Sequence, residues 1–217
     1  MSGKVRFLAN LLYTSCKSDP AIVVCLLCSA LTKLYSILFS TFWLLFIQSF
    51  LGTKITTQKD AQQIYTNVMM TSIVVGTCAI HIVGKFSDKC NPQIAMPLSF
   101  LARLVTIGLF MQIDDPSTSY CILTSCVMML GTMMENMTVD CLLLRKADPK
   151  IRGVLYSTAV AIGYCGLFVY SLVGGLLFDS YGPYAPFVLI GALDLVVGSI
   201  LAILGYCGVI SNDLVTI

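Results

Sequence analysis

Six ionisable side chains interrupt the long apolar stretches of this sequence and are the first candidates for chemistry: Lys33, His81, Arg103, Glu135, Asp140 and Asp194. An ionisable group inside a bilayer is costly, so it has to pair, reach water or exchange a proton. Glu135 is the strongest candidate, because no charged residue lies within four positions on either side of it. It could bind a proton or a substrate cation, or it could form a structural ion pair with Arg103 at similar depth.

Two of the other groups also have two interpretations each. Lys33 could bind an anionic part of a substrate, or its long side chain could extend toward the membrane surface. His81 is the only histidine, and it could relay protons near neutral pH or simply fill space near a helix end. We expect Asp140 to pair with Arg145 near the loop, and no partner for Asp194 is evident from the sequence.

The composition identifies the kind of chain that must position these groups. Hydrophobic residues make up 57% of the 217 residues and charged residues 11%, against about 25% charged in soluble domains. The mean hydropathy is +0.88. The net charge of +2 gives no electrostatic footprint for nucleic acid. A single histidine disfavours metal or acid–base enzymes, so the sequence predicts a membrane protein with no catalytic role, metal or cofactor.

Six apolar segments are long enough to cross a bilayer as helices, which need about 20 residues each. We therefore predict an all-α, polytopic fold with a cytoplasmic segment at 1–20, a six-helix bundle over 21–210 and a cytoplasmic tail at 211–217. The predicted spans are 21–51, 64–86, 94–113, 120–144, 154–178 and 184–210.

The basic residues between these spans predict the orientation of the chain. Nine Lys or Arg residues lie in the N-terminal segment and at the second and fourth connections, and two lie on the other side, Lys54 and Lys59. Loops with excess Lys and Arg remain in the cytoplasm. Both termini are therefore expected in the cytoplasm, with Asp114, Asp115 and Asp179 on the opposite side.

A short motif occurs twice and indicates an internal repeat. Gly84, Asp88 and Pro92 at the end of the second span match Gly175, Asp179 and Pro183 at the end of the fifth, in the pattern G-x-x-x-D-x-x-[N/G]-P, 91 residues apart. The matched spans are the middle helices of two successive triplets. Triplets contain an odd number of spans, so the two halves would form a 3+3 inverted repeat, as in several secondary transporters. Alternatively, Gly, Asp and Pro merely favour helix ends.

The motif Gly84-x-x-x-Asp88-Lys89 between two spans resembles the loop signature of the major facilitator superfamily, although Asn91-Pro92-Gln93 replaces the Gly and basic residues that usually follow. The stretch 148–153, which enters a Gly-rich span, is similar to that family's connection into helix 11. By this resemblance the whole chain corresponds to the C-terminal half, helices 7 to 12. The resemblance implies that Gly84, Asp88, Lys89 and Arg152 belong to a gating network, whereas Asp88 alone could also be a solvated loop charge.

The same resemblance implies secondary transport of a small solute by alternating access, within a lipid bilayer and together with a second six-helix half. Glu135, Lys33 and His81 would be the candidates for binding substrate or coupling ion, and Arg103 and Asp140 the candidates for structural ion pairs. The alternative is a half-transporter that does not transport and acts as a membrane scaffold or regulatory subunit.

Overall fold

The computed structural model describes residues 17, 19–89, 91–147, 149 and 151–207. The predicted tail at 211–217, and all of the predicted segment 1–20 except residues 17, 19 and 20, lie outside these ranges. The helices are α2 (Pro20–Ile37), α3 (Trp43–Gln48), α4 (Gln58–Lys89), α5 (Pro92–Phe110), α6 (Ser119–Lys146), α7 (Arg152–Tyr181) and α8 (Ala185–Tyr206), with a π-helical segment η1 (Leu38–Phe42) joining α2 to α3. The described part of the chain contains no strand, only an isolated bridge between Leu51 and Ile55.

Several of these apolar helices have the length of a membrane span. Five of them are long and apolar enough to cross a bilayer: 20–48, 58–85, 119–146, 152–181 and 185–206. A sixth apolar helix, Ile94–Phe110, is shorter. The predictions of an all-helical fold and of a multi-pass integral membrane protein are therefore confirmed at this level.

Local capping explains where particular helices begin and end. The Asp19 carboxylate accepts a hydrogen bond from the Ala21 amide at 2.9 Å, and Pro20 occupies the first turn, as is typical of helix starts. At α4, the Thr57 amide donates to Asp60 and the Asp60 amide donates to Thr57, forming a capping box. The α4 helix therefore begins at Gln58, within the segment that we expected to be a loop up to residue 63.

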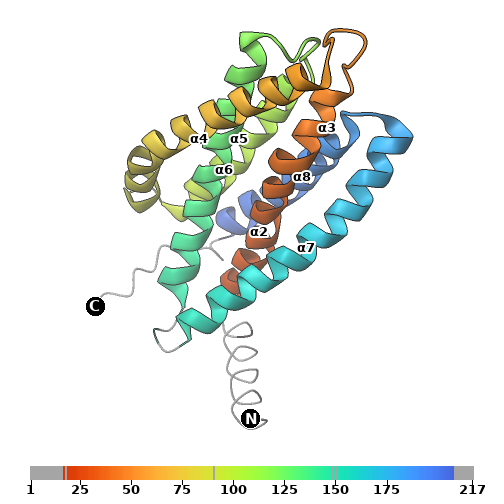
Figure 1. Ribbon diagram of the computed structural model, residues 1–217. Helices are drawn as coiled ribbons and strands as arrows, with labels where there is room; N and C mark the ends of the chain where they lie inside the picture. Colours follow the sequence, from red (N-terminus) through yellow and green to blue (C-terminus); the bar gives the residue numbers. More distant parts are fainter. Residues whose placement is uncertain (1–16, 18, 90, 148, 150, 208–217) are drawn as a thin grey trace.

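The helices form two layers (Figure 1). Along the first layer, α7 packs on α2, α2 on α6, and α6 on α4. Behind them α5 and α8 pack against each other, and α5 also packs along α6. Successive spans run in opposite directions (Figure 1), with α2, η1 and α3 forming the first of them, as short connections between membrane helices require. Gly182 ends α7 with φ +93°, a backbone conformation that favours glycine at a helix C-terminus.

One end of the bundle is packed with aromatic rings. Trp43 and Phe46 of α3, Phe110 of α5, and Tyr184 and Phe187 at the start of α8 form what we call the aromatic cluster. The Phe110 and Phe187 rings stack with centroids 3.9 Å apart, and Phe46 meets Phe110 at 4.6 Å. These contacts join the end of α5 to the beginning of α8, and so fix the register of that pair of helices.

Candidate functional site

Four buried polar side chains from four helices meet in the interior of the bundle. We call Tyr35 of α2, Arg103 of α5, Glu135 of α6 and Asp194 of α8 the charged cluster; each is at most 1% exposed. Arg103 Nε donates to Asp194 Oδ2 at 3.1 Å, and Arg103 Nη2 pairs with Asp194 Oδ1. Arg103 Nη1 forms an ion pair with Glu135 Oε2. One guanidinium group therefore joins α5 to both α6 and α8.

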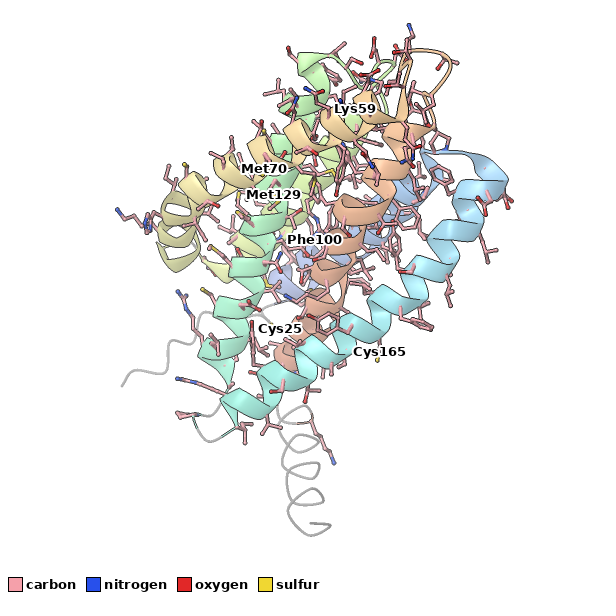
Figure 2. All side chains as sticks on the ribbon, in the orientation of Figure 1. Cys25, Lys59, Met70, Phe100, Met129 and Cys165 are labelled. Carbon is pink, nitrogen blue, oxygen red and sulfur yellow. The ribbon has the colours of Figure 1, made fainter. Side chains whose placement is uncertain are left out.

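Aromatic rings surround the Arg103 guanidinium. Its Cζ lies 3.9 Å from the centroid of the Tyr35 ring and 5.0 Å from that of Phe100. A cation over an aromatic face is attracted by the ring quadrupole, and the attraction is stronger where water is excluded. The Tyr35 hydroxyl also donates to Asp194 Oδ2, so Tyr35 contacts both charges of the Arg103–Asp194 pair. Figure 2 shows Phe100 in the middle of the bundle.

The two carboxyl groups of the cluster have unequal surroundings. Asp194 accepts from the Tyr35 hydroxyl and from Arg103 Nε and Nη2. Glu135 contacts Arg103 Nη1 through Oε2, and no described residue donates a hydrogen bond to its Oε1. The cluster contains one guanidinium and two carboxyl groups, so full ionisation would leave one buried negative charge without a cation of its own.

Glycines allow the helices around the cluster to approach closely. A Cβ placed on Gly131 of α6 would lie 3.1 Å from Arg103 Cγ, and one on Gly198 of α8 would lie 3.1 Å from Phe100 Cβ. Small residues at such contacts are typical of membrane helices, where tight packing drives association. Gly131 therefore brings the backbone of α6 against α5 next to the Arg103 side chain.

The antiparallel contact between α5 and α8 has a regular register. From the aromatic cluster inward, Phe110 meets Phe187, Ile107 meets Gly191, Arg103 meets Asp194 and Phe100 meets Gly198. Arg103 and Asp194 are 91 residues apart, the spacing of the repeated sequence motif. The same spacing separates Phe100 from Gly191 and Ile107 from Gly198. A shift of 91 residues thus exchanges the Ile107–Gly191 contact with the Phe100–Gly198 contact.

Lys33 and Asp140, predicted as separate candidates, lie on neighbouring helices outside the charged cluster. Lys33 is partly buried on α2, and a Cβ on Gly163 of α7 would lie 2.6 Å from its Cγ. Asp140 is partly buried on α6 and interacts electrostatically with Lys33. The two groups are therefore neighbours of opposite charge at the contact between α2 and α6.

His81 lies on an exposed face of α4 that is unusually polar for a membrane helix. The face contains polar residues at three- and four-residue spacing, Lys59, Gln63, Thr66, Asn67, Thr77, His81 and Lys85, all of them exposed, and we call it the polar face. Exposed Met70 and Val74 interrupt it near the middle, and Lys59 and Met70 are labelled along α4 in Figure 2. The opposite face is buried and carries Ala61, Val68, Ser72, Gly76 and Val83.

The residues of the predicted gating network lie at the ends of α4 and α7. Gly84 is partly buried, with open space where a Cβ would be. Asp88 and Lys89 belong to the last turn of α4, and their side chains lie outside the described part. Arg152, at the start of α7, donates from Nε to the Ala147 carbonyl at 3.2 Å, beyond the last turn of α6. Arg152 thus links the end of α6 to the beginning of α7.

The sequence pattern identified three members of the charged cluster but not their arrangement. It suggested the Arg103–Glu135 ion pair, which is present, whereas it gave no partner for Asp194 and did not single out Tyr35. The 91-residue spacing was the available signal, because it relates Arg103 to Asp194. Among the described residues no group of three or more His, Cys, Asp or Glu side chains could hold a metal ion.

Comparison with known proteins identifies no relative: no protein-family model matches the chain, and a search of curated proteins finds no match.

Proposed function

We propose that this chain is one six-helix half of an alternating-access transporter for a small polar solute, of the kind found in the major facilitator superfamily. The polar face of α4 is the observation that carries the proposal. A helix that crosses a bilayer cannot present amide, imidazole and ammonium groups to lipid without a large cost. Such a face has to border water or another polar protein surface.

The α7 helix, at the opposite edge of the first layer from α4, supports the same interpretation. The outward surface of α7 carries a shallow cleft near its beginning, lined by Gly153, Ser157, Thr158, Ala161 and Cys165 together with two aliphatic residues. The polar face of α4 and this cleft lie on the two outer helices of one layer (Figure 1). A second six-helix bundle placed against this layer would enclose an aqueous path between the two bundles.

An inverted repeat of 3+3 helices is part of the proposal. The symmetric contacts between α5 and α8 support it, because a two-fold axis through the Arg103–Asp194 pair would exchange the Ile107–Gly191 and Phe100–Gly198 contacts. The packing of α2 on α7 and of α4 on α6 also fits, since the exchange of halves converts one pair into the other. Repeats of this type are the units that rock during alternating access.

Six crossings with both termini in the cytoplasm complete the proposal. The α5 helix has 19 residues, about 28 Å at ~1.5 Å per residue, close to the ~30 Å hydrocarbon thickness of a bilayer. The orientation follows from the nine basic residues on one side and two on the other. Cysteines placed at Ser117 and Pro149 should react with an impermeant thiol reagent from opposite sides of the membrane. Reaction of both from one side would contradict the six-span topology.

Thiol accessibility also tests the proposed aqueous path. In a cysteine-free variant reconstituted in vesicles, cysteines at Asn67 and Thr77 on the polar face should react with an impermeant reagent. A matched cysteine at Ile82, an exposed apolar position away from the polar face of the same helix, should not. Equal reactivity of the three cysteines, or protection of the two on the polar face, would contradict an aqueous path along α4.

The alternative is a non-transporting scaffold, in which another chain covers the polar face permanently. A cysteine at Val74, midway along this face, separates the two functions. Alternating access predicts that this cysteine reacts with reagent added on either side of the membrane, because the path opens to one side at a time. A scaffold predicts protection from both sides, and a channel with one fixed opening predicts simultaneous access.

A further inference from the structure

Lys33 and Asp140 carry opposite charges that lie near each other without direct contact. Lys33 of α2 and Asp140 of α6 interact electrostatically, but neither side chain forms an ion pair or a hydrogen bond with a described residue. At the end of the same two helices, Lys146 and Asp19 do form an ion pair, at 3.8 Å. The contact between α2 and α6 therefore leaves one cation and one anion with unused binding capacity.

The antiparallel packing of α2 and α6 explains the gap between the two charges. Lys33 lies 14 residues after Asp19, and Asp140 lies six residues before Lys146. At ~1.5 Å per residue, the Lys33 backbone is therefore about 12 Å further from that end of the bundle than the Asp140 backbone. Helical side chains lean toward the start of their own helix, so these two lean toward each other without meeting.

Both charges reach the side of the first layer that the second layer leaves uncovered. The α8 helix packs behind α2 and α5 packs behind α6, yet Lys33 and Asp140 remain partly exposed. Their exposed parts therefore lie on the side away from α5 and α8, which we call the open face. Ser36, one turn after Lys33, is exposed, and Asn136, one turn before Asp140, is partly exposed.

The α7 helix completes the surroundings of Lys33. The α2 helix lies between α6 and α7 (Figure 1). A Cβ on Gly163 of α7 would lie 2.6 Å from Lys33 Cγ, so glycine at this position lets the lysine stem lie against the α7 backbone. The lysine is thus positioned by packing rather than by a counter-ion, and its ammonium group remains available to a ligand.

We propose that Lys33 and Asp140 bind a zwitterion, a small compound with one ammonium and one carboxylate group close together, as in a neutral α-amino acid. The ligand carboxylate binds the Lys33 ammonium, and the ligand ammonium binds the Asp140 carboxylate, through charge-assisted hydrogen bonds. The inference rests on the proposed transport function, because the open face borders the proposed aqueous path, and it names the class of substrate.

The arrangement of the charges favours a zwitterion over a simple ion. An anion at Lys33 would be repelled by Asp140, and a cation at Asp140 would be repelled by Lys33. A zwitterion satisfies both groups and leaves no uncompensated charge in a partly buried site. The Asn136 amide nitrogen donates to the Thr132 carbonyl at 2.9 Å, which leaves the Asn136 carbonyl oxygen as a further acceptor for the ligand ammonium.

Equilibrium binding to the full chain in lipid nanodiscs tests the proposal, with radiolabelled glycine, L-leucine and L-phenylalanine as probes. We expect at least one of the three to bind. Its analogues that lack one charge, which for L-leucine are isopentylamine and 4-methylpentanoate, should bind about tenfold more weakly or worse, since each loses a charged hydrogen bond. No binding of any of the three amino acids, or equal binding of a single-charge analogue, would overturn the proposal.

Substitutions assign the binding to the two residues. Lys33→Gln and Asp140→Asn should each weaken amino-acid binding about tenfold or more. Lys54→Gln and Asp114→Asn, which remove exposed charges between helices, are the controls and should leave the affinity unchanged. Unchanged affinity in Lys33→Gln or Asp140→Asn would overturn the assignment. If either variant failed to fold, the single-charge analogues tested on the unmodified protein would decide.

Thermal unfolding without ligand distinguishes a binding site from a structural pair. Because Lys33 and Asp140 are not in direct contact, each single variant should unfold at nearly the same temperature as the unmodified protein. A lower unfolding temperature in both single variants, restored in the double variant, would make the two residues a structural pair and overturn the proposal.

The outcome for this site is separable from the outcome for transport. Two-sided reactivity of Val74→Cys reports alternating access and does not depend on which solute binds. Two-sided access without amino-acid binding would overturn the zwitterion site and leave transport standing. Amino-acid binding with Val74→Cys protected from both sides would support the site and contradict transport.

Discussion

The contact between α5 and α8 has two parts held together in different ways. At one end, the aromatic cluster packs Phe110 on Phe187 with the rings 3.9 Å apart. About two turns further along, the same helices meet through the buried Arg103–Asp194 pair. Aromatic packing depends on shape and tolerates adjustment, whereas a buried ion pair depends on the presence of both partners. Aromatic packing therefore sets the register of α5 and α8 at one end, whereas the stability of their contact at the other end depends on charge.

The largest expected effect is at the ion pair. Asp194→Asn retains the size of the side chain but leaves the Arg103 guanidinium without its two-point partner in a site from which water is excluded. Removal of one partner of a buried pair costs about 3–5 kcal/mol. We expect a loss of that size in the free energy of unfolding, measured by denaturant titration in lipid–detergent micelles.

A second substitution shows whether charge is the cause. Arg103→Gln in the Asp194→Asn background removes the cation that has lost its two-point partner and should restore part of the lost stability. Equal stability of Asp194→Asn and the unmodified protein would mean that the pair is not a structural link between α5 and α8.

The aromatic cluster should respond by a smaller amount. Phe110→Ala removes a fully buried ring that contacts Trp43, Phe46 and Phe187. Truncation of a core Phe costs about 3–5 kcal/mol in soluble proteins, and part of that cost should be absent here because lipid is itself apolar. We expect about 2 kcal/mol in the same unfolding assay. Leu101→Ala, on the exposed side of the same helix, is the control and should change stability by much less.

A pair of adjacent glycines tests whether the aromatic end tolerates added volume. A Cβ on Gly174 of α7 would lie 2.6 Å from Phe42 Cζ, whereas one on Gly175 would have nothing within 4 Å. Overpacking of this kind costs about 1–3 kcal/mol, so Gly174→Ala should destabilise the protein by about that amount. Gly175→Ala should be neutral or slightly stabilising, because alanine favours helix. Equal effects of the two substitutions would show that Phe42 moves aside without cost.

The sequence predicted the helical elements better than the contacts between them. Apolar runs longer than 18 residues identify membrane helices because every backbone polar group has to be satisfied inside lipid. The start of α4 was predicted too late, because the expected loop up to residue 63 includes the Thr57–Asp60 capping box. The π-helical segment at Leu38–Phe42 was not anticipated, since no composition rule distinguishes it from ordinary helix.

The candidate site was predictable only in part, for a physical reason. Burial of charge inside an apolar run is visible in a sequence, and it identified Arg103, Glu135 and Asp194. Which carboxyl group makes the two-point contact with the guanidinium depends on how α5, α6 and α8 pack, through glycines such as Gly131. Tyr35 was overlooked because a tyrosine in an apolar segment is unremarkable until its hydroxyl is seen to bind Asp194.

The smallest expected change in stability is at Glu135, and it separates this residue most sharply from Asp194. If Glu135 holds a proton, Glu135→Gln replaces one neutral group by another of similar shape, and the free energy of unfolding should change by less than about 1 kcal/mol. If Glu135 is instead the ionised partner of Arg103, the same substitution leaves part of a buried cation uncompensated and should cost about 3–5 kcal/mol. Arg103→Gln in the Glu135→Gln background would then restore stability. A large loss in the single variant that the double variant repairs would therefore make Glu135 a structural partner of Arg103, while normal pH-dependent uptake by Glu135→Gln in the intact transporter would reject its role in coupling.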